Sequence, residues 1–124
     1  MSRRSVPSPT DAELAILRVL WERGPSTVRE VHEELSSSQA TRYTTTLKLM
    51  QIMTEKGLVR RDESRRAHVY QPAVPEQQTL SRLTGELLER AFGGSAEKLV
   101  MHALQAGKVS AEELARIRQL LDEL

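Results

Sequence analysis

Residues 42–70 read RYTTTLKLMQIMTEKGLVRRDESRRAHVY, and the order of patterns in this stretch decides the fold. Its first half has the period of an α-helix, with an inward stripe made of Thr46, Leu49, Met50 and Met53. Gly57 then ends the helix, because glycine adopts the left-handed conformation that often follows a helix C-terminus. Residues 58–61 and 67–70 have the pattern of two short strands around the polar loop 62–66. A helix followed at once by a basic hairpin indicates a winged helix-turn-helix.

Two further helices are expected upstream of this stretch. Residues 10–13 and 27–30 each form a capping box, in which a Thr and the Glu three positions later satisfy free backbone N–H groups. Gly24-Pro25 separates the two helices, since neither residue continues a helix. We therefore predict a winged-helix domain over residues 10–75, preceded by a disordered tail over residues 1–9.

Three amphipathic helices are expected downstream of Pro72 and Pro75. Gly93-Gly94 and Gly107 separate them, and a segment this short buries its apolar faces poorly on its own. We therefore predict a helical dimerisation domain over residues 76–124, and a homodimer. Its interface residues are expected to be Leu80, Leu83, Leu87, Leu99, Leu114, Ile117 and Leu121. The predicted fold is mainly α with a small β-hairpin, a winged helix-turn-helix followed by a helical dimerisation segment.

Composition excludes several classes of protein. The chain has no cysteine, which excludes disulfides, thiolate metal sites and cysteine nucleophiles. No apolar run approaches the ~18 residues that a membrane span needs. The N-terminus lacks the apolar core of a signal peptide. We expect a cytoplasmic protein that does not insert into a membrane.

Positive charge is concentrated in the stretch that decides the fold. The whole chain has a formal net charge of only +1, but residues 42–66 contain seven basic and three acidic residues, a net charge of +4. Residues 76–124 contain six basic and eight acidic residues, a net charge of −2. Binding to a polyanion depends on such local fields rather than on total charge.

The helix at residues 42–56 is suited to the major groove of DNA, which accepts one α-helix and presents base edges to its side chains. Its outward face is a polar ridge, which by itself could equally be an ordinary solvated face. The basic hairpin that follows, about residues 60–70, favours DNA, since wing arginines suit the phosphate backbone. The expected DNA-binding residues are Thr27, Arg29, Arg42, Tyr43, Thr44, Thr45, Lys48, Gln51, Arg65 and Arg66.

No pattern indicates an enzyme, a cofactor or a metal site. The three histidines, His32, His68 and His102, each lack a second ligand at metal-binding spacing. The sequence has neither a G-x-S-x-G nucleophile elbow nor a glycine-rich phosphate loop. Two alternatives to a DNA-binding repressor stay open: a winged-helix module that binds proteins only and, less favoured, a small hydrolase or metal enzyme.

Five motifs, in this order, resemble the BlaI/MecI penicillinase-repressor family: TDAE at 10–13, TVREVH at 27–32, YTTT at 43–46, EKGLV at 55–59 and RAHVY at 66–70. The resemblance extends over about residues 8–124. It implies a homodimeric winged-helix repressor on a palindromic, inverted-repeat operator in double-stranded DNA. It also implies a membrane sensor-protease pathway that triggers cleavage of the repressor within its dimerisation region.

The resemblance places the recognition helix at Tyr43 to Lys56 and the wing at Arg60 to Tyr70. This chain departs from the family at two positions. Ile52 stands where family members often have Arg, and His102-Ala103 aligns with the Asn-Phe cleavage pair on which induction by proteolysis depends. A copper-responsive branch of the family uses C-terminal cysteines, which are absent here.

Overall fold

The computed structural model describes residues 6–38 and 40–124, and the chain divides into two compact units. The front unit ends at Arg82, and the back unit spans Leu83–Leu124. The sequence placed this boundary after residue 75. It falls later because the start of the next helix belongs to the front unit, where Thr79 is buried.

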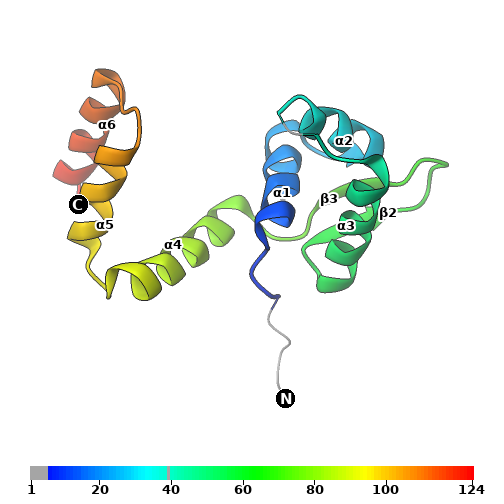
Figure 1. Ribbon diagram of the computed structural model, residues 1–124, viewed down its shortest axis with the longest axis horizontal. Helices are drawn as coiled ribbons and strands as arrows, with labels where there is room; N and C mark the ends of the chain where they lie inside the picture. The colour runs from blue at the N-terminus through cyan, green and yellow to red at the C-terminus, as the bar shows by residue number, and fades with distance from the viewer. Residues whose placement is uncertain (1–5, 39) are drawn as a thin grey trace, which may run out of the picture. The chain divides into compact units, whose positions relative to one another are not determined.

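The front unit has the element order of a winged helix (Figure 1). Its elements are α1 (Asp11–Arg23), β1 (Ser26–Thr27), α2 (Val28–Ser36), α3 (Tyr43–Lys56), β2 (Val59–Asp62) and β3 (Val69–Pro72). Helix α4 (Glu76–Phe92) begins in this unit and continues into the back unit, which also contains α5 (Ala96–Ala106) and α6 (Ala111–Asp122). The predicted class, mainly α with a small β-hairpin, is confirmed.

The sheet has three antiparallel strands in the order β1-β3-β2. Arg61 pairs with Tyr70 across the hairpin, and Ser26 pairs with Tyr70 on its other side. Sequence patterns predicted the two hairpin strands slightly too early in the chain and missed β1 altogether. A two-residue strand has no periodicity of its own and exists here only because β3 lies beside it.

Local signals set the helix ends as predicted. The capping boxes of Thr10 with Glu13 and of Thr27 with Glu30 are present as predicted. Gly57 caps α3 with a φ of 84°, in the left-handed region that favours glycine.

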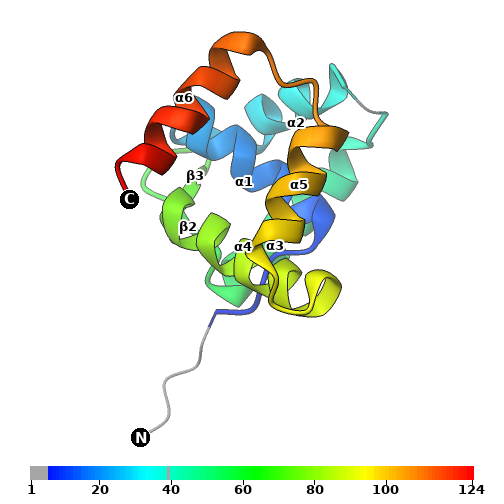
Figure 2. The same ribbon diagram turned by 90° about the vertical axis from the view of Figure 1, so that its left-hand side faces the viewer.

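The core of the front unit lies where the three helices meet the base of the hairpin (Figure 1). Figure 2 shows α1 and α2 of this unit from a second direction. Tyr70 is the largest side chain that is fully buried in it. Thr46, Met50 and Met53 of the predicted α3 stripe are buried, whereas Leu49 is only partly buried. The remaining core residues are Ile16, Leu17, Leu20, Val28, Val31, Leu35, Leu58 and Val59.

The N-terminal segment is ordered where the structure describes it. Val6 packs against the core, and its carbonyl oxygen accepts a hydrogen bond from the Arg82 guanidinium. The expectation of a disordered tail over residues 1–9 is therefore wrong at Val6, because this apolar side chain has a core to bury against. Residues 1–5 of that expected tail lie outside the described residues.

The back unit has no core of its own. Over residues 83–124, all of which the structure describes, no residue is buried. Among the described residues, no helix has the length and apolar character needed to cross a bilayer.

Candidate nucleic-acid interface

Helix α3 presents a polar ridge to solvent, as the sequence predicts. Thr44, Thr45, Lys48 and Gln51 are all exposed, and they come from the face opposite the buried methionines Met50 and Met53. Hydroxyl, ammonium and carboxamide groups on one helix face can donate to and accept from base edges in a major groove. The ridge is therefore accessible to DNA, while the opposite face of α3 packs into the core.

The N-terminus of α3 differs from those of α1, α2, α5 and α6. Thr10, Thr27, Ser95 and Ser110 each cap a helix with a side-chain oxygen. Arg42, the N-cap residue of α3, makes no such bond. The start of α3 therefore has no side-chain oxygen on its N–H groups, and the exposed Arg42 stands beside it. A helix N-terminus and a guanidinium both favour an anion such as a phosphate.

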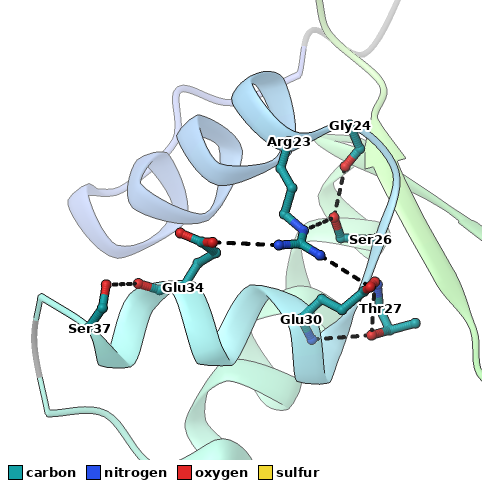
Figure 3. Close-up of polar contacts among 7 residues, drawn as sticks. All are labelled: Arg23, Gly24, Ser26, Thr27, Glu30, Glu34 and Ser37. Carbon is teal, nitrogen blue, oxygen red and sulfur yellow. Dashed lines mark hydrogen bonds and ion pairs between the residues drawn. The ribbon is translucent and has the colours of Figure 1, made fainter.

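Arg23, in the last turn of α1, fixes the start of α2 (Figure 3). Its guanidinium lies 3.2 Å from the Glu30 carboxylate and 3.5 Å from that of Glu34, and Nε donates to the Ser26 hydroxyl at 3.2 Å. The Thr27 backbone N–H donates to Glu30 at 2.9 Å and, together with Arg23, holds the pKa of Glu30 below its ordinary value. The Thr27 hydroxyl is itself engaged in this cap, so its main role is to shape the α2 N-terminus.

A pocket of about 310 Å³ lies where the starts of α2 and α3 meet the wing hairpin. Four of the predicted DNA-binding residues, which the sequence separates widely, line this one pocket: Thr27, Arg29, Tyr43 and Arg66. The Arg29 guanidinium carbon lies 5.8 Å from the centre of the Tyr43 ring, a cation–π distance. We call this hollow the wing pocket.

The wing presents arginines at its tip. Arg65 and Arg66 are exposed in the loop between β2 and β3. The Ser64 backbone N–H donates to Asp62 at 2.9 Å, which shapes the turn and lowers the pKa of the Asp62 carboxyl. Arg61 instead lies 2.7 Å from Glu63, so part of its charge is neutralised within the wing.

Two histidines near the interface were not predicted as site residues. His68 lines the wing pocket, and His32 lies edge-to-face against Tyr43 at a ring distance of 5.6 Å. The side chain of His32 is half-buried. Nothing in local spacing could have shown these contacts, because Tyr43 and the wing reach the histidines only through tertiary folding.

The predicted dimerisation residues lie at the surface of the single chain. Leu80, Leu87 and Leu121 are exposed, with Leu121 at 57%. The other predicted interface residues are half-buried, and they are Leu83, Leu99, Leu114 and Ile117. Four more large apolar residues are exposed in the back unit, and the sequence prediction omitted them: Val100, Met101, Leu120 and Leu124.

A helix-turn-helix with an exposed polar recognition helix and a basic hairpin defines the class of winged-helix DNA-binding proteins. Comparison with known proteins narrows the class. The model of the penicillinase repressor family matches residues 9–123, and the chain belongs to this family.

Two curated relatives match nearly the whole chain. The penicillinase repressor of Bacillus licheniformis is 26% identical over 120 residues, which cover 97% of this chain and 94% of that protein. The transcriptional regulator BlaI of Mycobacterium tuberculosis is 34% identical over 116 residues, which cover 92% of this chain and 83% of that protein.

Two solved structures match the front of the chain. The DNA-binding domain of the repressor BlaI, in solution, superposes with a TM-score of 0.53 at 27% identity, covering 60% of this chain and 90% of that one. The monomeric form of Bacillus licheniformis BlaI in complex with the blaP half-operator superposes with a TM-score of 0.52 at 27% identity, covering 59% and 89%. The predicted fold and family are confirmed, and the chain is a DNA-binding transcriptional repressor.

Proposed function

We propose that this protein represses transcription as a homodimer bound to an inverted-repeat operator in double-stranded DNA. The observation that best supports this is the polar ridge of α3, exposed along its length and flanked by the basic wing. In this proposal α3 enters the major groove, where Lys48 and Gln51 reach base edges. A bound dimer then blocks access to the promoter by occupying it.

Backbone contacts come from the rim of the same surface. The uncapped start of α3 with Arg42, the start of α2 with Arg29, and the wing tip with Arg65 and Arg66 all suit phosphates. Such contacts set the position of α3 on the duplex but do not choose the sequence. The BlaI structure with a half-operator shows that a relative with this fold binds DNA.

The homodimer is supported by the uncovered apolar surface of the back unit. Met101 is 52% exposed, Leu120 is 62% exposed and Leu121 is 57% exposed. Exposed apolar side chains in such number mark an interaction surface. A second copy of the chain is the natural occupant, because an inverted repeat needs two recognition helices related by a two-fold axis.

Induction would act by separating or distorting this dimer. His102 and Ala103, which align with the family's cleavage pair, have exposed side chains within α5. A protease acting there would first need α5 to open locally, because its backbone is hydrogen-bonded as a helix. We therefore propose that induction alters the dimer interface and does not cut the bond between His102 and Ala103.

The proposal is tested by selecting duplexes that bind the full chain from a random library. We expect an inverted repeat to be enriched, and binding to weaken steeply as salt rises, because phosphate contacts release counterions. A duplex with one half-site scrambled serves as the matched control and should bind much more weakly. The alternative, a protein-interaction module, predicts no enriched sequence and no salt-dependent binding to any duplex.

A further inference from the structure

His32 connects the interior of the front unit to its DNA-facing surface. One ring nitrogen, Nδ1, lies 3.3 Å from the hydroxyl of Thr46, a fully buried residue of α3. The other, Nε2, lies 3.3 Å from the hydroxyl of Ser36, one turn further along α2. With both nitrogens in hydrogen-bond contact, the imidazole ring has one preferred orientation.

The imidazole of His32 contacts the ring of Tyr43. The two ring centres lie 5.6 Å apart and the planes are inclined by 80°, the edge-to-face geometry that aromatic pairs favour. The Arg29 guanidinium lies 5.8 Å from the centre of the same tyrosine ring. Tyr43 is thus held between two residues of α2 that are one turn apart.

Tyr43 is the first residue of α3 and lines the wing pocket. Its side chain is 40% exposed, so the ring is held by α2 and yet open to a ligand. A tyrosine in this position can place its hydroxyl on a phosphate or its ring on a sugar. Either contact depends on the direction in which the ring points.

We propose that His32 is a positioning residue for DNA binding, which orients the ring of Tyr43 by coupling it to the buried hydroxyl of Thr46. This inference rests on the proposed function, since it assigns a role in operator binding. It differs from a role in folding, because His32 is only half-buried and its ring contacts the exposed ring of Tyr43.

The test is a double-mutant cycle on operator affinity. Four full-length proteins are compared: the parent, His32→Ala, Tyr43→Ala and the double variant. We expect His32→Ala to weaken binding about 2- to 10-fold in the parent, the range that an aromatic pair contributes. In the Tyr43→Ala background the same change should have almost no effect, because the side chain that it positions is gone.

A purely structural role makes the opposite prediction. Loss of stability would weaken binding equally with and without the Tyr43 side chain, and equal losses would overturn the proposal. Thr46→Val provides a second variant, which removes the buried hydroxyl and keeps the side-chain shape. It should weaken binding in the parent and again have little effect in the Tyr43→Ala background. Glu33→Ala, an exposed change on α2, is the matched control and should leave affinity unchanged.

A measurement on the free protein separates this inference from the proposed function. The ring protons of His32 should shift in the NMR spectrum when Tyr43→Ala removes the neighbouring ring current. If the parent binds the selected operator but the cycle is additive, the positioning role is wrong while the repressor function stands. If the parent binds no duplex at all, the proposed function is wrong, and the positioning role is wrong with it. An unchanged His32 signal in Tyr43→Ala would overturn the contact itself.

Discussion

Glu13 illustrates how single residues hold this fold together. Its carboxylate is only 2% exposed, yet it accepts hydrogen bonds from the Thr10 backbone N–H at 2.9 Å and from Lys56 Nζ at 2.7 Å. Burial on its own raises the pKa of Glu13, but the bonds from Lys56 and Thr10 outweigh burial and leave the pKa below its ordinary value. One carboxylate thereby joins the start of α1 to the end of α3.

We predict that Glu13→Gln makes the stability of the protein less dependent on pH. A carboxyl group whose pKa is lowered by folding stabilises the fold above its unfolded pKa, near 4.5, and this stabilisation is lost as pH falls through the folded value. At pH 7 the variant should lose about 1–3 kcal/mol, less than a fully buried pair because Lys56 is partly exposed.

Thermal melts between pH 7 and pH 3 check this prediction. The parent should lose more stability on acidification than Glu13→Gln, so that the two curves converge at low pH. Glu55→Gln, an exposed carboxylate of α3, is the matched control and should follow the parent curve. Parallel curves for Glu13→Gln and the parent would contradict the assignment.

A second prediction concerns the two faces of α3. Single alanine variants at the exposed ridge should each cost ~1–3 kcal/mol of operator binding where the side chain contacts a base well, and leave stability unchanged. The variants are Thr44→Ala, Thr45→Ala, Lys48→Ala and Gln51→Ala. Met50→Ala, on the buried face, should instead cost ~2–5 kcal/mol of folding stability by leaving a cavity. Affinity and melting curves separate the two effects. Equal losses on operator and random duplexes would mean that the ridge contacts phosphates only.

At the scale of elements, the helices could be predicted from local chemistry. Features that depend on tertiary pairing could not. Thr-x-x-Glu caps and the glycine after α3 act within a few residues, so the sequence shows them directly. Strand β1 exists only through its pairing with Val69 and Tyr70 of β3, far along the chain. The wing pocket likewise combines α2, α3 and the wing loop. Of the residues that line it, residue type suggested only Thr27, Arg29, Tyr43 and Arg66.

The wing is an element whose role can be measured as one unit. We predict that Arg65→Ala with Arg66→Ala weakens binding to operator and random duplexes alike, because backbone contacts do not read sequence. The slope of log affinity against log salt should flatten by about one unit for each phosphate that the wing no longer neutralises.

Titrations of both duplexes over a range of salt concentrations provide the measurement. Arg18→Ala, an exposed charge on α1, is the control for a general loss of positive charge. A wing that points away from DNA would leave the salt slope of the double variant unchanged.

At the scale of the whole molecule, the two units differ in what they bury. The front unit has a complete core and an exposed polar surface, whereas the back unit has apolar surface and no buried residue over its described positions 83–124. Apolar periodicity predicted this back unit as a dimerisation segment. It could not predict which side chains stay exposed, because that depends on how α4, α5 and α6 are packed, and Met101 and Leu120 were missed for this reason.

The last prediction tests the dimer through this surface. Leu83→Asp with Leu121→Asp places one carboxylate on the apolar stripe of α4 and another on that of α6. Desolvating unpaired carboxylates in an apolar interface is costly, so we expect the double variant to sediment as a monomer where the parent sediments as a dimer. Operator affinity should fall with it, because two half-sites bound by separate chains lose the effective concentration that the dimer provides.

Ser81→Asp with Gln119→Asp adds the same two charges at exposed polar positions on the same helices, and this control should remain dimeric. Folding of the front unit should persist in both double variants, since its core lies outside the altered positions and Trp21 reports on it independently. If the Leu83→Asp and Leu121→Asp variant sediments like the parent, the stripes of α4 and α6 do not form the interface. The two recognition helices would then need to be joined through another surface, and the exposed residues Val100 and Met101 of α5 would be the next to change.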